Sequence, residues 1–252
     1  MAEAAPSEER QQLLRKVIPN ETVLALRHTS DLQGVLQTLF TVGTLVVGAS
    51  LVFLSRGNLL ALLVLGFFVS FLFMPLHECV HRTAFKSAFA NDSVAFVTGV
   101  LTLRPPVHYK RYHNAHHRFT GDPDKDPELS DSWVDPSLKT FPSYCLYLSG
   151  LMFWIDRVMT VVKHACGIVQ EFYLSSFHDE IVSEARLFLG IYFCLGCLGL
   201  TNPGVARVLM LYWIIPSFLG QPFLRFYLIA EHNGCKQGVD MMGNTRTTLT
   251  HW

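Results

Sequence analysis

The chain has 252 residues, of which 50% are hydrophobic and only 16% are charged. Soluble proteins average about 25% charged residues, and a mean hydropathy of +0.29 points away from both a soluble and a disordered protein. The 20 Lys and Arg are balanced by 20 Asp and Glu, so there is no excess of positive charge to bind a nucleic acid.

Four uncharged stretches are each long enough to cross a membrane as a helix. The first pair covers 32–55 and 57–76, and the second covers 187–206 and 208–224, the last extended by the apolar residues 226–230. A helix rises about 1.5 Å per residue, so about 20 residues cross a hydrocarbon core of roughly 30 Å. We therefore predict an all-α integral membrane protein with about four transmembrane helices in two hairpins.

Two shorter apolar stretches, 93–103 and 140–155, fall short of this length. We expect both to lie at the membrane surface or to re-enter it, with a spanning helix over 140–155 as the alternative. Lys and Arg are concentrated before the first helix and between the two hairpins, whose tips contain only Arg56 and Arg207. The positive-inside rule then predicts a cytosolic N-terminal segment, 1–31, and a membrane domain, 32–252, with its polar helices capping the cytosolic side.

Histidines are clustered where the predicted hairpins end. In His77-Glu78-Cys79-Val80-His81 the two imidazoles are four residues apart, and in His113-Asn114-Ala115-His116-His117 they follow at three and four residues. Residues with these spacings share one face of a helix, so their rings can reach one metal ion. A further histidine follows the fourth helix on the same side of the membrane. The candidate metal ligands are His77, His81, His113, His116, His117 and His232.

Imidazole nitrogens bind iron, zinc, copper or nickel rather than magnesium or calcium. Six histidines exceed the three protein ligands that are typical of a catalytic zinc, so the pattern favours two metal ions. An all-nitrogen ligand set at a membrane surface suits iron that reacts with O2. His108 precedes the second cluster and is a candidate outer partner. The isolated His28, His164 and His178 are expected to be ordinary structural residues.

The first cluster also matches H-E-x-x-H, the zinc metalloprotease signature, with Glu78 as general base. An intramembrane protease of this kind needs a further ligand, usually acidic, on another membrane helix. The uncharged windows between 187 and 230 contain none, and the second histidine cluster would have no role. We retain the protease as an alternative from another class.

Acidic residues between 122 and 128 imitate the start of a calcium loop. Pro127 occupies the position where an EF-hand requires Gly, and Trp133 occupies that of the bidentate Glu. We therefore expect a solvated acidic loop, in which Asp126 and Glu128 could orient the imidazoles as outer partners.

The two clusters, H-x-x-x-H at 77–81 and H-x-x-H-H at 113–117, resemble the first two histidine boxes of the membrane fatty acid desaturase superfamily. The flanking residues 118–122 and 126–129 are similar as well. Residues 231–235 and 244–248 resemble the stretch that leads into the third box. The resemblance extends from about residue 18 to about residue 250.

The resemblance implies a membrane di-iron oxidoreductase of lipid metabolism that desaturates a fatty acyl chain with O2. It implies two iron ions held by the six candidate histidines, a lipid acyl substrate, and cytochrome b5 or ferredoxin as electron donor. It also implies the endoplasmic reticulum as location if the source is eukaryotic. A carotenoid or sterol hydroxylase or ketolase of the same superfamily is the alternative within this class.

The expected third box, another H-x-x-H-H after 244–248, is not in the sequence, which ends at His251-Trp252. We therefore expect a desaturase domain that is incomplete at its C-terminus and inactive as this chain alone. A non-catalytic membrane adaptor is the corresponding alternative.

Overall fold

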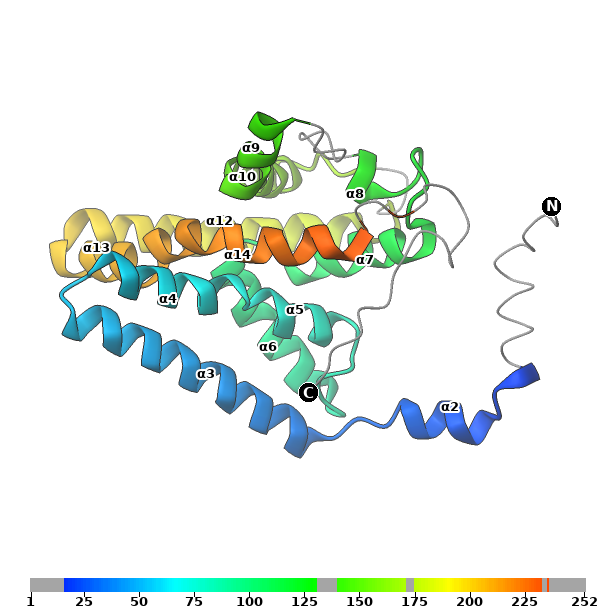
Figure 1. The fold of residues 1–252 in the computed structure, drawn as a ribbon. Coiled ribbons are helices and arrows are strands. Elements are labelled where there is room, and N and C mark those ends of the chain that lie inside the picture. The colour runs from blue at the N-terminus through cyan, green and yellow to red at the C-terminus, as the bar shows by residue number, and fades with distance from the viewer. Residues whose placement is uncertain (1–15, 131–139, 171–174, 233–234, 236–252) are drawn as a thin grey trace.

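The computed structural model describes residues 16–130, 140–170, 175–232 and 235, and within these ranges the regular elements are helical (Figure 1). In chain order they are α2 (Asn20–Leu26), α3 (Asp31–Leu54), α4 (Leu59–Ser70), α5 (Phe73–Val80), α6 (Ala88–Thr102), α7 (Pro106–Phe119), α8 (Pro127–Ser130), α9 (Phe141–Ser149), α10 (Leu151–Ala165), the 3₁₀ turn η1 (Ser175–Phe177), α12 (His178–Thr201), α13 (Pro203–Leu209), the π-helical turn η2 (Met210–Ile214) and α14 (Ile215–His232).

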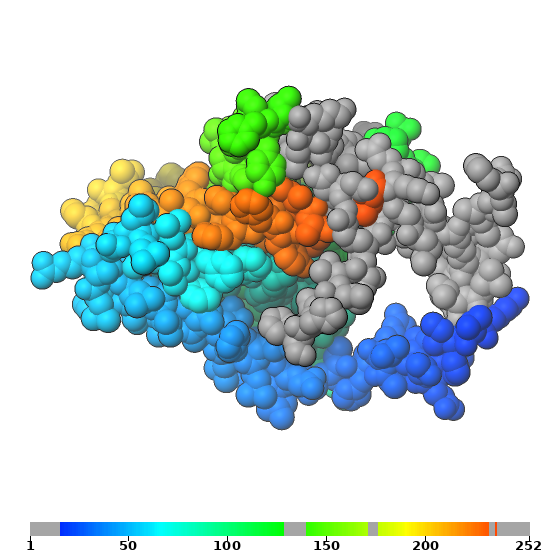
Figure 2. Space-filling model, viewed as in Figure 1, coloured from blue at the N-terminus to red at the C-terminus, as the bar shows by residue number. Residues whose placement is uncertain are grey.

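Four helical stretches are long and apolar enough to cross a membrane, as predicted: Asn20–Leu54, Leu59–Val80, His178–Thr201 and Pro203–Glu231. Their apolar residues are not all buried in the molecule. Figure 2 shows α3 along one edge, where Phe40 and Phe53 are each about three-quarters exposed. Side chains of this kind are stable against lipid, which agrees with an all-α membrane protein.

The first hairpin turns where the sequence predicted, because Arg56 and Gly57 adopt positive φ angles and the Asn58 side chain accepts a hydrogen bond from the amide of Leu60. The second hairpin differs from the prediction. The first helix of this hairpin, which is the third span of the chain, runs over His178–Thr201 rather than 187–206. The tip of the hairpin is at Asn202. Pro203 has no N–H to continue α12, and the Asn202 side chain caps α13 instead.

Two of the spans are interrupted within the predicted apolar stretches. Between α4 and α5 the regular helix is broken at Phe71 and Leu72, and the fourth span contains the π-helical turn η2. Within η2, the indole N–H of Trp213 donates a hydrogen bond to the carbonyl oxygen of Leu101. Each interruption changes the direction in which the residues after it project.

The helices α4 and α14 meet backbone to backbone. A Cβ atom on Gly220 would collide with the carbonyl oxygen of Gly66, and one on Gly66 would lie 2.7 Å from the carbonyl oxygen of Pro216. Only glycine permits such an approach. Since α5 follows directly from α4, this contact fixes the position of the first histidine cluster relative to α14.

The two shorter apolar stretches form helices beside this bundle. Residues 93–103 end α6, and 140–155 are divided between α9 and α10, which bend by 51° at Gly150. Gly150 has φ 67°, and a Cβ there would lie 2.6 Å from the side chain of Gln221 on α14. Neither helix alone is long and apolar enough to cross a membrane, whereas the two together are. The re-entrant or interfacial placement of this pair therefore stays a prediction.

Candidate metal centre

The histidines of the first cluster project from a helix whose other face is buried. On α5, Phe73, Leu76 and Val80 pack into an apolar core with Tyr109 of α7 and Leu224 of α14. This arrangement leaves His77 and His81, one turn apart, on the face that points towards α7.

The second histidine helix is held at its first turn by a carboxylate from α12. Glu184 accepts hydrogen bonds from the backbone amides of Val107, at 2.9 and 3.0 Å, and of His108, at 3.3 Å. The oxygens of this carboxyl group satisfy amides that have no partner within the helix. This contact could not be predicted from local sequence patterns, because 76 residues separate Glu184 from His108.

Four imidazoles from α5 and α7 converge in two facing pairs. His113 Nε2 lies 2.8 Å from His77 Nε2, and His117 Nε2 lies 3.2 Å from His81 Nε2. One ligand nitrogen of each residue lies within 4.8 Å of those of the other three. The i and i+4 spacings therefore bring together the residues that the sequence suggested, from both clusters.

The protonation of these imidazoles fits a metal site. Burial, together with the neighbouring imidazoles, lowers the pKa of His81 and of His117 to about 4, and burial also lowers the pKa of His113. These rings are therefore neutral at pH 7, and a neutral imidazole is the form that binds a metal ion. Four imidazole nitrogens at this separation suit a transition metal such as iron or zinc and do not suit magnesium or calcium.

An outer carboxylate contacts one of the four. His77 Nδ1 lies 3.0 Å from Glu78 Oε1, and the Thr83 hydroxyl donates to Glu78 Oε2 at 2.6 Å. Hydrogen bonds of this kind fix the tautomer and orientation of a metal-binding histidine, so that Nε2 faces the metal. Thr83 was not identified from the sequence.

His116 lies outside the group of four. Its Nδ1 is 2.9 Å from Asp126 Oδ1, and Asp126, only 2% exposed, also accepts from the backbone amides of Gly121 and Glu128, both at 2.9 Å. Burial alone would lower the pKa of His116, but the hydrogen bond to Asp126 and the charge of Glu128 outweigh it and raise that pKa. The expectation of a solvated loop is therefore wrong at Asp126, because three donors allow its charge to be buried.

Glu128 lies between His116 and the group of four histidines. Its carboxylate oxygens are 3.7 Å from His116 Nδ1 and 3.9 Å from His113 Nδ1. The half-exposed Glu128 thus contacts one ring of the group of four and the ring outside it, in the neighbourhood that the sequence suggested for it.

The structure places His108 away from the group of four. His108 is buried, and its ring centroid lies 4.5 Å from that of His164, one of the histidines expected to be isolated. Burial lowers the pKa of His108 well below its usual value, so this pair is held together without positive charge. His232 ends α14, but its side chain lies outside the described part of the chain, as do residues 236–252.

Comparisons with known proteins agree with this geometry. A sequence model of the family described as fatty acid desaturase matches residues 56–252. The chain is similar to a fatty acid desaturase of Bacillus subtilis (strain 168), with 37% identity over 95 residues, which are 35% of this chain and 27% of that relative. The chain thus spans about a quarter of the length of this curated relative. The chain belongs to the fatty acid desaturase family.

Proposed function

We propose that this chain forms the iron-binding part of a membrane oxidoreductase that desaturates fatty acyl chains in an O2-dependent reaction. The observation that carries the proposal is the convergence of four imidazoles from two helices, whose ligand nitrogens lie within 4.8 Å of one another. Membership of the desaturase family supports a lipid acyl substrate and a membrane location.

In this proposal His77, His81, His113 and His117 hold one iron ion. His116, whose Nδ1 is engaged by Asp126, would contribute its Nε2 to a second ion, together with His232. Bound iron would supply the O2-dependent oxidation of an unactivated C–H bond. The chain's own contribution is to hold the rings: Glu78 orients His77, and Asp126 orients His116.

The proposed partners are a lipid that reaches the site from the bilayer and an electron-transfer protein, cytochrome b5 or ferredoxin. We propose that the histidines face the cytosol, because Lys and Arg are concentrated on their side of the chain. If the source is eukaryotic, the proposed membrane is that of the endoplasmic reticulum.

The zinc protease is disfavoured by the same geometry. A protease site would need His77 and His81 with a single further ligand, whereas two more imidazoles face them here. Glu78, the required general base, instead contacts His77 Nδ1 and Thr83. A hydroxylase or ketolase of the same superfamily would use the same histidines, and only product analysis separates it from a desaturase.

Metal analysis of the purified chain tests the proposal. We expect the anaerobically prepared chain to bind ferrous iron, visible by Mössbauer spectroscopy, and the double variant His81→Ala, His117→Ala to lose it. His178→Ala changes an exposed histidine outside the group and should retain iron. Tight zinc that iron does not displace, or iron that persists in the double variant, would contradict the proposal.

A further inference from the structure

Three arginines surround one aromatic ring inside the helical bundle. The Cζ atoms of Arg225, Arg104 and Arg157 lie 4.5, 4.7 and 5.8 Å from the ring centroid of Phe153. Arg157 is paired with the carboxylate of its neighbour Asp156. Within the described ranges, Arg104 and Arg225 make aromatic contacts, but neither has a carboxylate partner. Two like charges next to one ring, with Glu128 acting on Arg104 only from a distance, are electrostatically unfavourable.

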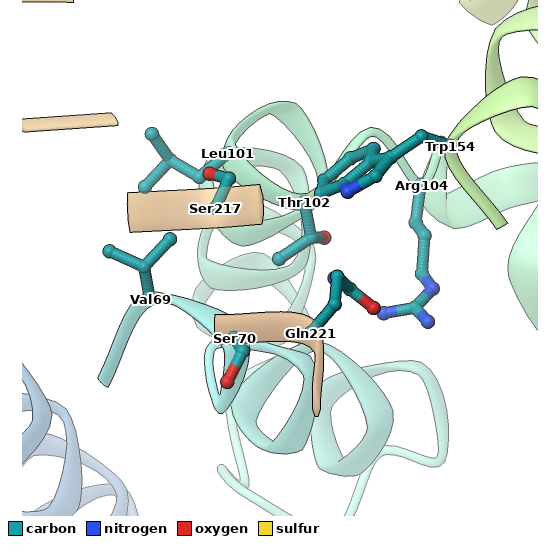
Figure 3. A pocket seen from close by; sticks show the side chains of 8 residues that line it. All are labelled: Val69, Ser70, Leu101, Thr102, Arg104, Trp154, Ser217 and Gln221. Atoms are coloured by element: carbon teal, nitrogen blue, oxygen red, sulfur yellow. The ribbon is translucent and has the colours of Figure 1, made fainter. Parts of the chain in front are cut away.

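A cavity with room for about one oxygen atom or water molecule adjoins this arginine cluster. Arg104, Trp154 and Gln221 project towards one another around it (Figure 3), and Ser217 lines it from α14. Three of these side chains have a buried polar atom without a hydrogen-bond partner: Trp154 Nε1, Ser217 Oγ and Gln221 Oε1. Arg225, one turn after Gln221, has two more, Nε and Nη2. Ser217 and Gln221 are at least nine-tenths buried.

The chain adopts a rare backbone conformation where it delivers Arg104 to the interior. Leu103 has φ 56°, which costs a non-glycine residue roughly 1–2 kcal/mol. Arg104 follows it and is only 6% exposed. Burial, together with the charges of Arg157 and Arg225, lowers the pKa of Arg104 to about 9, so its guanidinium is still positive at pH 7. The left-handed Leu103 is the C-cap of α6, where the Arg104 amide donates to the Gly99 carbonyl oxygen, so it is the buried guanidinium that needs a compensating interaction.

An alkyl chain alone would not satisfy these groups. A buried donor without a partner costs about 1–3 kcal/mol, and a charged one costs more. A bridging water molecule could satisfy Trp154 and Gln221, but it would not neutralise two guanidinium groups. An oxyanion would do both, because its oxygens accept hydrogen bonds from the arginines and from the indole N–H.

The cluster is separated from the histidines by a single aromatic ring. Arg104 Cζ lies 4.3 Å from the ring centroid of Phe73, whose ring lies 5.8 Å from that of His77 and 5.8 Å from that of Tyr109. Tyr109 in turn stacks on His113 at 5.2 Å. The arginine cluster and the candidate metal centre are therefore neighbours that both contact Phe73.

We propose that Arg104 and Arg225, with the indole N–H of Trp154, bind the oxyanion at the head of a lipid inside the bundle. This chemistry is shared by the carboxylate of an unesterified fatty acid and by a lipid phosphate, and a neutral ester lacks it. The proposal rests on the proposed function for the identity of this lipid as the substrate. Binding itself can be measured without turnover.

Competition binding on the purified full chain in an uncharged detergent tests this site. Tritiated palmitate should bind saturably, and methyl palmitate, which has the same chain without the charge, should compete at least about tenfold more weakly. Dodecyl phosphate distinguishes the two sources: stronger competition by it than by dodecanoate assigns a phosphate, and weaker competition a carboxylate. Equal competition by palmitate and its methyl ester would overturn the proposal.

Variants locate the binding in the chain. Arg104→Gln and Arg225→Gln should each weaken palmitate binding at least about tenfold, whereas Arg207→Gln, which removes an exposed cation from α13, should not change it. Trp154→Phe keeps an aromatic ring and removes only the N–H, so a severalfold loss is expected even if an arginine variant does not fold. Wild-type affinity in folded Arg104→Gln and Arg225→Gln would overturn the proposal.

Iron content, measured on the same samples, separates this proposal from the proposed function. Arginine-dependent palmitate binding without iron would support the oxyanion site and contradict the iron proposal. Iron binding without discrimination between palmitate and its methyl ester would support the iron proposal and contradict the oxyanion site. The double variant His81→Ala, His117→Ala should lose iron and keep palmitate binding.

Discussion

Neighbouring histidines of α7 have pKa values that are shifted in opposite directions. His113 and His117 face the imidazoles of α5, and the pKa of each is lowered by burial. His116, the neighbour of His117 in sequence, faces Asp126 and Glu128, and its pKa is raised. The partner across the helix interface, more than the residue type, therefore decides which of these histidines is neutral and ready to bind a metal ion.

This difference in pKa has a consequence for the pH dependence of metal binding. Burial lowers the pKa of His81, His113 and His117, whereas the raised pKa of His116 means that this ring holds a proton to higher pH next to Asp126. We expect metal binding at the group of four to be less dependent on pH than metal binding that involves His116.

The largest expected effect comes from removing one ring of the group of four. His113→Ala should weaken iron binding by more than the roughly 10- to 100-fold that the loss of an outer partner costs, because a direct ligand and the partner of His77 both disappear. His116→Ala should leave the iron held by the group of four in place. Iron titration with elemental analysis measures both variants. Equal losses of iron would contradict the different roles of His113 and His116.

Asp126→Asn removes the charge next to His116 and keeps the shape of the side chain. We expect the pKa of His116 to fall and the free energy of unfolding to decrease by about 2 kcal/mol, because the buried hydrogen bonds lose their charged acceptor. Thermal or denaturant unfolding at pH 6 measures this change. Asp124→Asn, at an exposed carboxylate two residues away, is the matched control and should unfold like the wild type.

Acid should weaken the imidazole face of the metal-free protein. Unfolded His81 and His117 take up protons below their ordinary pKa of 6.5, but in the folded state they do so only near pH 4. Stability should therefore fall as the pH decreases from about 6.5 to about 4. His116 has the opposite sign: its stabilisation is present below 6.5 and is lost as the pH rises through its raised pKa. Unfolding temperatures across this range should show a shallower decline in His117→Gln than in the wild type, and an unchanged slope would refute the assignment.

The smallest effect is expected at the first turn of α7, which positions both faces. Glu184→Gln keeps one oxygen that accepts from Val107 and His108 but replaces the second acceptor at Val107 with an NH2 group, so about 0.5–1 kcal/mol of stability should be lost. Glu180→Gln, at an exposed carboxylate one turn earlier on α12, is expected to have no effect. Chemical unfolding of the three proteins in one detergent compares them.

Much of the architecture could be predicted from local sequence patterns. Uncharged windows long enough to cross a bilayer predicted the four spans, and the i and i+4 spacing predicted that His77, His81, His113 and His117 share facing surfaces. Both predictions depend on the geometry of a single helix, which the sequence specifies directly.

Features that depend on contacts between distant segments could not be predicted in this way. The pairing of His108 with His164 joins α7 to α10, and each residue looks isolated in the sequence. The burial of Asp126 depends on a backbone amide five residues earlier, at Gly121, and on His116. The break at Phe71 and Leu72, by contrast, has a local signal, because Pro75 lacks the N–H that would bond to the Phe71 carbonyl four residues earlier.

The contact between Gly66 and Gly220 restricts how a lipid can reach the interior. Two backbones that touch directly have no side chains between them that could rotate aside, and parting them would also displace α5 with its histidines. The side of α14 that faces α4 is therefore closed to passing molecules. If the proposed lipid enters beside α14, we expect it to do so along the face of α14 that is turned away from α4.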